Sequence, residues 1–332
     1  MMHLNEIAKL IGQSTTIGIT FHTSPDGDSL GSALALLIAL KNKNKMAYII
    51  SQEKIPEDFS YLPFGSEISG NLQEPIENTE LVIVLDCGNR ERINAKLNNY
   101  KNTLINIDHH LSNDMYGDFN YVDTRAAAVA EIVYELIAIL NMKINKDIAT
   151  CLYTSLLTDT GSFKYSNTTS RTHNIAAKLI DTSIDFTSIH RNIYENKSFK
   201  FLKLQGMVLE NMYLLLDNKI CIMEIHEKML KAINYVLEDS SEIISYGLKV
   251  KGVEISVLFK EATNGVKISF RSKDTADVRK IAENFSGGGH SKASGAFIPN
   301  VTLEEAKNIV IPKLKDELKL WMAYWIFINQ KE

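Results

Sequence analysis

The chain has 332 residues, which is enough for two domains that each bury a core. Its hydrophobic content of 45% and charged content of 23% are those of an ordinary soluble globular protein. The formal net charge of -4 argues against binding of long duplex nucleic acid, which depends on a basic surface. It leaves open a small anionic ligand held by metal ions.

The cysteines and the chain ends bear on the compartment. Cys87, Cys151 and Cys221 lie far apart and form no CxxC pair, so no disulfide framework is predicted and a cytoplasmic protein is expected. The first residues lack a signal peptide, and no apolar run approaches the roughly 18 residues of a membrane span. The aromatic tail at 320–327 is expected to be a docked helix end or a partner contact.

Strands and helices alternate along the first part of the chain, which is typical of an α/β fold with a parallel sheet. The periodicity predicts helices and strands in this order: a helix over 3–13, a strand over 16–21, a helix from 33 to 40 and a strand over 46–50. The polar segment 22–32 is predicted to be the loop between the first strand and its helix. In an open α/β sheet such a loop lies at the carboxyl ends of the strands, where ligands usually bind.

Two further predicted strands also end in polar side chains. The apolar run 81–85 fits a central parallel strand that is buried on both faces, and Asp86 follows it. The run 104–107 leads in the same way into Asp-His-His at 108–110. Because the carboxyl ends of parallel strands meet at one edge of a sheet, these side chains are expected to lie beside the first loop.

The middle of the chain is predicted to be helical. Helices are expected over 126–140 and 147–157, and the second runs into Asp159, a further carboxylate. A helical linker is placed at 186–205, where polar residues break the pattern. The expected division is therefore a metal-binding catalytic domain over 1–185, the linker, and a smaller α/β substrate-binding domain over 206–332.

The last part of the chain alternates as half-buried strands do. A hairpin with its turn at 263–265, a helix over 277–285 and a helix from residue 303 are predicted. Between the helices, the sequence predicts a glycine-rich loop at 286–290 and a short strand over 295–298.

Six side chains at the predicted sheet edge offer oxygen or imidazole donors and no thiolate: His22, Asp26, Asp28, Asp86, His109 and Asp159. Two divalent cations would balance the four carboxylates, and this donor set suits Mn²⁺ or Mg²⁺ rather than a structural zinc site. Two such ions roughly 4 Å apart can share a hydroxide nucleophile and stabilise charge on a phosphoryl group. An imidazole outside the ligand set can donate a proton to the leaving oxygen.

The chain also resembles the DHH/DHHA1 phosphoesterase superfamily, most closely its NrnA branch. The motifs that carry the resemblance occur in that family's order: His22-x-x-x-Asp26-Gly27-Asp28, Asp86, Asp108-His109-His110, Thr158-Asp159-Thr160-Gly161 and Gly287-Gly288-Gly289-His290. The match runs from about residue 5 to 315. It implies a parallel-sheet DHH domain, a smaller α/β DHHA1 domain and an active site in the cleft between them.

The resemblance also implies ligands for two Mn²⁺ ions, with Mg²⁺ or Co²⁺ as alternatives. It places His22 and Asp26 on one ion and Asp86 between the two. It places Asp28, His109 and Asp159 on the other ion.

The remaining family positions are implied to act on the substrate. His110 would face the substrate phosphate as a hydrogen-bond donor or general acid, and Asp108 would orient a histidine. In the second domain Arg271 and the run Gly287, Gly288, Gly289 and His290 would hold the nucleotide, through a forked guanidinium contact and close backbone N–H groups.

One segment departs from the branch. Where relatives carry serine and threonine before a helical Ala-Glu, this chain has Ala126-Ala127-Ala128. If those hydroxyls seat a phosphate in relatives, substrate preference or rate changes here, and Arg125 could partly substitute.

The implied reaction is metal-dependent hydrolysis of very short RNA (nanoRNA) to nucleoside monophosphates, together with conversion of 3'-phosphoadenosine 5'-phosphate (pAp) to AMP. Four alternatives stay open: a phosphodiesterase for linear or cyclic dinucleotides, an inorganic pyrophosphatase, a processive single-strand exonuclease and a nucleotide sensor without catalysis. The Gly287–His290 motif argues against the pyrophosphatase, and the acidic chain without an added nucleic-acid-binding domain argues against the exonuclease. The oligomeric state, a homodimer included, is not fixed by the sequence.

Overall fold

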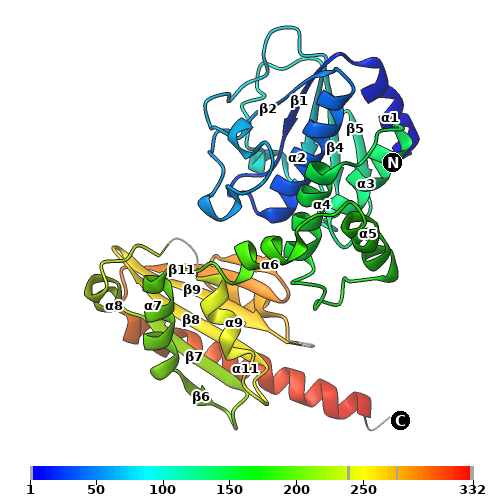
Figure 1. Ribbon diagram of the computed structural model, residues 1–332. Helices are drawn as coiled ribbons and strands as arrows, with labels where there is room; N and C mark the ends of the chain where they lie inside the picture. Colours follow the sequence, from blue (N-terminus) through cyan, green and yellow to red (C-terminus); the bar gives the residue numbers. More distant parts are fainter. Residues whose placement is uncertain (1–2, 238–239, 274–275, 330–332) are drawn as a thin grey trace. The chain divides into compact units, whose positions relative to one another are not determined.

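The structure is a computed structural model that describes residues 3–237, 240–273 and 276–329, without the side chains of His290 and of 319–329. The chain divides into two compact units, Met1–Asn196 and Lys197–Glu332 (Figure 1). The boundary falls within the range 186–205. Helix α6 (Phe186–Tyr194) belongs to the first unit and helix α7 (Phe199–Glu210) to the second.

The first unit is built on a five-stranded sheet in the order β2-β1-β3-β4-β5, and every strand pair in it is parallel. Its strands are β1 (Thr16–Thr20), β2 (Met46–Ile49), β3 (Leu81–Leu85), β4 (Thr103–Asp108) and β5 (Phe119–Val122). Strand β3 is central and buried at every residue, because its unbroken apolar run meets packing on both faces. The predicted α/β fold with a parallel sheet is confirmed.

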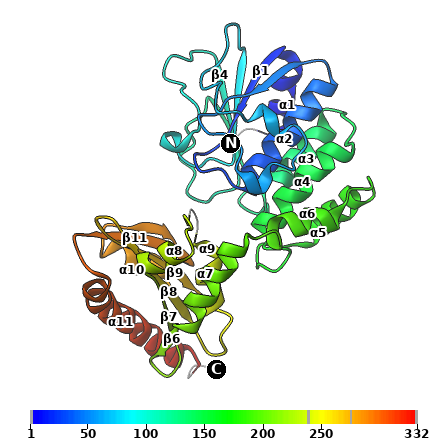
Figure 2. The ribbon, with the colours of Figure 1, turned by 60° about the vertical axis from the view of Figure 1, so that its left-hand side comes forward.

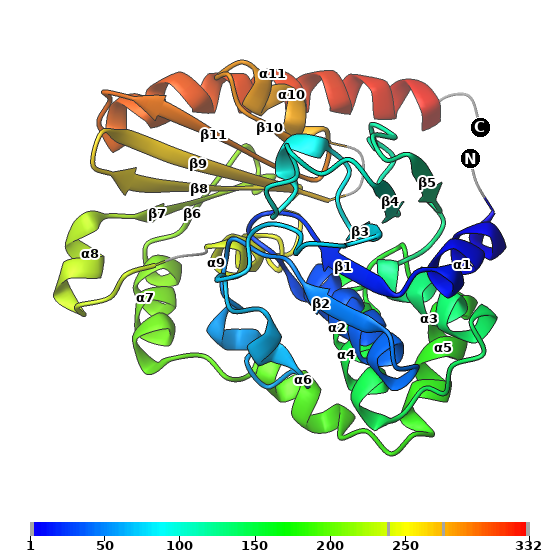
Figure 3. The same ribbon diagram turned by 90° about the horizontal axis from the view of Figure 1, so that it is seen from above.

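Helices cover one face of this sheet. The helices of the first unit besides α6 are α1 (Leu4–Gln13), α2 (Gly27–Asn42), α3 (Val129–Ile139), α4 (Lys146–Asp159) and α5 (Ser170–Ile180). Side chains such as Ile17 and Ile83 join one core with side chains of α1–α4. Figure 3 shows these helices on one side of the sheet. Val82 and Val84 point to the opposite face, where residues of the irregular segments pack, among them Ile93 and Leu97. Three short 3-10 helices interrupt the irregular segments: Glu57–Phe59, Gly65–Glu67 and Arg90–Arg92.

Helix α2 begins earlier than the sequence predicts. The expected start was residue 33, yet the helix begins at Gly27, so most of the polar segment forms its first turns. The reason is the cap, because the Asp26 carboxylate accepts hydrogen bonds from Asp28 N and Ser29 N at 3.1 Å each. Asp28 is thereby held on a helix rather than on a loop.

The second unit contains a six-stranded sheet in the order β10-β11-β9-β8-β7-β6. Its strands are β6 (Tyr213–Leu215), β7 (Ile220–Ile225), β8 (Ile255–Ala262), β9 (Gly265–Ser272), β10 (Gly288–His290) and β11 (Ala293–Pro299). Only β7 and β8 pair in parallel among the strands described. The remaining helices are α8 (Glu227–Ala232), α9 (Ser241–Gly247), α10 (Val278–Glu283) and α11 (Leu303–Asn329).

Both faces of this second sheet are covered. Ile220 and Ile222 of β7 join the cluster that includes side chains of α10 and α11, while the alternate residues Cys221 and Met223 join the cluster that includes side chains of α7 and α9. Figure 2 shows α11 and α7 on opposite sides of the strands. Among the described residues, no helix has the length and apolar character required to cross a bilayer. The side chains of the aromatic tail at 320–327 lie outside the described part.

The glycine-rich run is a strand and not the predicted loop. Gly288 and Gly289 pair antiparallel with Gly295 and Ser294 of β11. A Cβ at Gly287 would lie 2.2 Å from the Gly295 carbonyl oxygen, and Gly289 has a φ of 135°. Glycine is therefore required for close approach and for backbone conformation, and the resulting edge strand extends the sheet. The predicted hairpin between β8 and β9 is confirmed.

Candidate metal centre

Six of the predicted ligands meet at one edge of the first sheet. His22 follows β1, Asp86 follows β3 and His109 follows β4, all at carboxyl ends of parallel strands. Helices bring the carboxylates Asp26 and Asp28 at the start of α2 and, as its last residue, Asp159 of α4. Three strands and two helix ends thus converge on one point, which is the expected ligand position in an open α/β sheet.

The side chains form two groups, and Asp86 of the first group also faces His109 of the second. In the His22 group (His22, Asp26 and Asp86), His22 Nε2 lies 3.6 Å from Asp26 Oδ1 and 3.5 Å from Asp86 Oδ2. In the His109 group (Asp28, His109 and Asp159), His109 Nε2 lies 3.7 Å from Asp28 Oδ2 and 3.4 Å from Asp159 Oδ2. Asp86 Oδ1 is 3.6 Å from His109 Nε2, so the two Asp86 oxygens face different groups.

Both histidines direct the same ring nitrogen toward the carboxylates. His22 Nδ1 is 2.8 Å from the Thr23 carbonyl oxygen, and His109 Nδ1 is 3.1 Å from the Ala126 carbonyl oxygen. A carbonyl only accepts, so each Nδ1 carries the proton and donates it. In the neutral ring, Nε2 then has a free lone pair directed into the site, which is the arrangement of a metal-ligating imidazole.

Asp28 is fixed more tightly than any surface carboxylate. It is fully buried, and its oxygens accept hydrogen bonds from Ser32 Oγ at 3.1 Å, Ser155 Oγ at 2.5 Å and Val129 N at 2.9 Å. The contact to Ser155 requires α2 and α4 to lie close together. Gly31 allows this, because a Cβ there would lie 2.4 Å from the Cys151 carbonyl oxygen.

The surroundings of the Asp86 carboxylate show whether a cation fits this site. Its side chain is buried, yet Oδ1 has no hydrogen-bond partner among the described residues. Its backbone is left-handed, with a φ of 54°, a conformation that costs free energy for a residue other than glycine and that clusters at functional sites. A buried carboxylate oxygen without a donor, 3.6 Å from His109 Nε2, fits a divalent cation as its missing partner.

The electrostatics of the cluster indicate the same need. Burial raises the pKa of Asp28, Asp86 and Asp159, and neighbouring carboxylates raise it further. Burial opposes the charged form of His22, but the adjacent carboxylates more than offset it and raise its pKa to about 11. The same balance raises the pKa of His109 to about 9. Positive charge is thus favoured between these carboxylates, and bound divalent cations would supply it.

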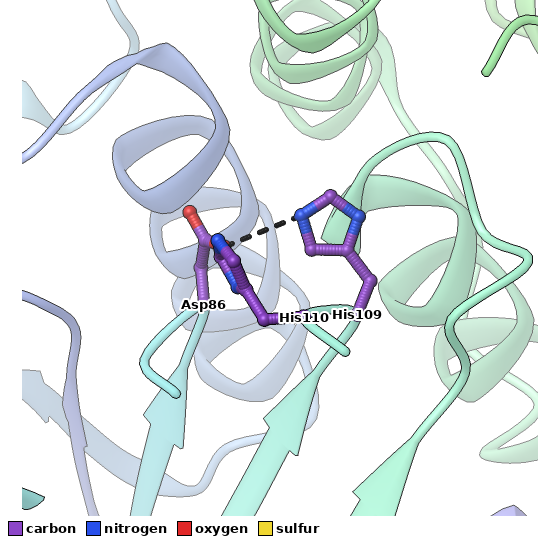
Figure 4. Close-up of side chains that lie close together, drawn as sticks. All are labelled: Asp86, His109 and His110. Carbon is purple, nitrogen blue, oxygen red and sulfur yellow. Dashed lines mark ion pairs between the residues drawn. The ribbon is translucent and has the colours of Figure 1, made fainter. Parts of the chain in front are cut away.

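His110 is held by Asp108, outside the two ligand groups. Its Nδ1 donates to Asp108 Oδ1 at 2.7 Å and lies 3.6 Å from Asp86 Oδ1, and Asn113 Nδ2 donates to Asp108 Oδ2 at 2.6 Å. Figure 4 shows Asp86, His109 and His110 together at the ends of neighbouring strands. Asp108 therefore orients His110, two residues further along the chain. The contact of Asn113 with Asp108 was not predicted from the sequence.

The alanine segment 126–128 supports the centre through its backbone. The Ala126 carbonyl accepts from His109, and Val129 N, directly after the segment, donates to Asp28. The three alanine side chains are buried, while the Arg125 side chain is 91% exposed and pairs with Asp123 at 3.4 Å. From the sequence, only lost hydroxyl groups and a partial substitute in Arg125 were expected here, because backbone contacts leave no signature in side-chain types.

An ion-pair network around the half-buried Arg171 holds the same segment, and it was not predicted from the sequence. Arg171 of α5 contacts Asp123 Oδ2 at 2.9 Å, Glu131 Oε2 at 3.3 Å and Glu135 Oε1 at 2.9 Å. Glu131 is fully buried and also accepts a hydrogen bond from Thr172 Oγ1. Since these carboxylates lie on both sides of the alanine segment, Arg171 fixes its two ends.

The predicted nucleotide-binding residues lie in the second unit. Arg271 on β9 donates through Nη1 to the Phe270 carbonyl at 3.0 Å and through Nη2 to Ser241 Oγ at 3.4 Å. Its neighbour across the sheet is Ala293 of β11, whose other partner is His290. Arg271 on β9 and the glycine run on β10 thus lie on either side of β11 at one end of the strand order, and the His290 side chain lies outside the described part.

Comparisons with known proteins agree across both units. A family model described as the DHH family, N-terminal domain, matches residues 16–156, and the DHHA1 domain matches residues 224–322. A Streptococcus mutans protein named probable bifunctional oligoribonuclease and PAP phosphatase NrnA is 34% identical over 316 residues, covering 94% of this chain and 98% of that protein. A Thermus thermophilus protein named bifunctional oligoribonuclease and PAP phosphatase NrnA is 30% identical over 302 residues, covering 91% of this chain and 90% of that protein.

A solved structure shares the architecture. The crystal structure of an exopolyphosphatase-related protein from Bacteroides fragilis has a TM-score of 0.86 and 26% identity, and the match covers 96% of each chain. The residues that meet at the sheet edge are those of the DHH motifs. The chain therefore belongs to the DHH family and carries a DHHA1 domain after its DHH domain.

Proposed function

We propose that this chain is a metal-dependent hydrolase that cleaves short oligoribonucleotides to nucleoside monophosphates and converts pAp to AMP. The observation that carries the proposal is the pair of ligand groups joined by Asp86, whose buried Oδ1 has no hydrogen-bond partner in the described chain. The named activities of relatives at 30–34% identity over about nine tenths of the chain support the choice of substrates.

The ligand roles proposed are those of the two groups. His22 and Asp26 would hold one divalent cation, Asp28, His109 and Asp159 would hold the other, and Asp86, which faces both His22 and His109, would serve both. Two Mn²⁺ ions there would polarise the phosphoryl group and lower the pKa of an attacking water. The chain itself keeps the geometry, through Nδ1 contacts of the histidines and the three donors to Asp28.

His110 is proposed to act on the substrate. Asp108 accepts from its Nδ1, so the ring is held in one orientation with Nε2 as the other nitrogen available for a proton. His110 then donates a hydrogen bond or a proton to the leaving oxygen. Arg271, the run Gly287, Gly288 and Gly289, and His290 are proposed to bind the nucleotide, a role supported by the open space at Gly288, where an added Cβ would meet no atom within 4 Å.

A cytoplasmic location is part of the proposal. The three cysteines are free and buried, which fits a reducing compartment. The net charge of -4 argues against long duplex nucleic acid as a substrate.

The proposal is tested with a panel of dinucleotide, pentanucleotide, pAp and cyclic dinucleotide, incubated with Mn²⁺ and resolved by chromatography. We expect AMP from pAp and mononucleotides from the linear RNAs. Asp86→Ala and His109→Ala should abolish both activities while circular dichroism stays native. Asp147→Asn, at an exposed position in the first turn of α4, is the matched control and should keep full activity. Full activity of either site variant, or wild-type protein that hydrolyses none of the panel, would contradict the proposal.

A further inference from the structure

A tightly fixed turn directly follows the ligand Asp159. Gly161, Ser162 and Phe163 have left-handed φ values of 55°, 62° and 62° in succession. The Thr160 carbonyl oxygen accepts hydrogen bonds from the backbone N–H groups of the residues at 164 and 165, at 2.9 Å each. Successive left-handed residues other than glycine are strained, so surrounding contacts must maintain this turn.

The two aromatic residues of the turn have opposite surroundings. Phe163 packs inward, with its ring centroid 6.2 Å from that of Tyr153 and 5.1 Å from that of His173. Tyr165 is 56% exposed. Phe163 therefore anchors the turn, while Tyr165 is presented to solvent.

The Tyr165 ring lies with one face on Gly161. An added Cβ at Gly161 would lie 2.4, 2.6 and 2.7 Å from Cζ, Cε2 and Cε1 of Tyr165, and the hydroxyl oxygen is not among these nearest atoms. An approach from the ring edge would meet the hydroxyl first, so the glycine lies beneath a ring face. Any larger residue at 161 would displace the ring.

The turn is also tied to the metal centre. Asn167 Nδ2 donates to the carbonyl oxygens of Asp159 and Ala127, at 3.0 Å each. Gly161 is two residues from Asp159, so their Cα atoms are at most about 8 Å apart. The exposed ring is thus held near the ligands by the backbone on both sides of the turn. The neighbouring Lys164 is exposed and makes no ion pair within the described part of the chain.

We propose that Tyr165 is the stacking platform for a nucleobase of the substrate, with its outer face against the base. The assignment deepens the proposed function and rests on it for the choice of a nucleotide. An aromatic ring whose inner face is covered and whose orientation is fixed loses little entropy when a base stacks on its outer face. Stacking accepts any base, which suits an enzyme that degrades RNA fragments of every sequence.

The test compares AMP with ribose 5-phosphate, which lacks the base, by calorimetric binding to the full chain with Mn²⁺. Tyr165→Leu should weaken AMP binding about tenfold and leave ribose 5-phosphate binding unchanged. Tyr165→Phe should bind AMP as the wild type does. Phe186→Leu, which replaces another exposed aromatic residue of the same unit, should change neither affinity.

Three outcomes would overturn the assignment: AMP that does not bind the wild type, unchanged AMP affinity in Tyr165→Leu, or equal losses for AMP and ribose 5-phosphate. The last would mean that the side chain only supports the turn. Hydrolysis by the wild type is scored separately. If Tyr165→Leu loses AMP binding but the wild type hydrolyses no substrate, the proposed function alone is contradicted. If the wild type hydrolyses its substrates and Tyr165→Leu binds AMP normally, only the stacking platform is contradicted.

Discussion

The two ligand groups differ in how rigidly their carboxylates are held. In the His109 group, Asp28 is fully buried and its carboxylate accepts three hydrogen bonds, from side chains of α2 and α4 and from the backbone of the first residue of α3. In the His22 group, the Asp26 side chain is 56% exposed and is held by the first turn of its own helix. A ligand fixed by distant elements has less entropy to lose when an ion binds, so we expect the His109 group to bind its ion more tightly.

The largest effect should come from the residue common to both groups. Asp86→Asn removes a charge that faces both histidines, and it should lower kcat by more than about 100-fold, beyond the cost of losing an outer partner. Calorimetric titration should show that both Mn²⁺ affinities fall. If only one of them fell, Asp86 would belong to one group and the comparison above would need a different boundary.

The second largest effect should come from loss of the Arg171 guanidinium, which contacts the buried Glu131. Arg171→Met leaves Glu131 buried without its partner, and it should lower the free energy of unfolding by about 3 kcal/mol, as measured with urea. Because Arg171 fixes the segment that contacts His109 and Asp28, the tighter Mn²⁺ affinity should fall while the weaker one is kept.

The double variant Glu131→Gln/Arg171→Met is the control for this prediction. It removes the stranded charge and should recover more than half of the lost stability. A single variant as stable as the wild type would show that the pair contributes nothing to the position of the segment.

Substitution of a hydroxyl residue at the His109 group tests the effect of rigidity without a change of charge. Ser155→Ala deletes one donor to Asp28 without changing the net charge, and it should weaken the tighter Mn²⁺ affinity by about tenfold. Thr150→Ala on the same helix, where the hydroxyl only contacts the Lys146 carbonyl, serves as the control and should keep both affinities. Equal behaviour of the two variants would contradict the role given to Ser155.

The smallest effect is expected at the His22 group. Ser29→Ala removes the hydroxyl that receives a hydrogen bond from Asp26 N at 3.1 Å, but the Asp26 carboxylate keeps its backbone donors. The weaker Mn²⁺ affinity should therefore change by less than about threefold, below the usual cost of an outer partner. A larger loss than that of Ser155→Ala would reverse the order of rigidity proposed for the two groups.

The elements that the sequence predicts well are those in which the spacing of apolar residues indicates which side chains are buried. The unbroken apolar run of β3 and the amphipathic spacing of α1 each predict their structure without reference to a partner. Strand β5 was missed, because Phe119–Val122 is short and largely half-buried and is a strand only through its pairing with β4. The strand β10 was predicted as a loop, since two of its three residues are glycines that carry no side-chain pattern and its register comes from pairing with β11.

The residue types that end the parallel strands can be read from the amino-acid sequence, and they predict that carboxylates and imidazoles gather at one sheet edge. The roles of these residues as ligands stay predictions. The groups that hold them become visible in the folded molecule, such as Ser155, which reaches Asp28 across 127 positions of sequence, and the Ala126 carbonyl that orients His109. The reason is physical: strand and helix periodicity is local and is written in side chains, whereas hydrogen bonds from the backbone or from a distant helix depend on the packing of α2 against α4.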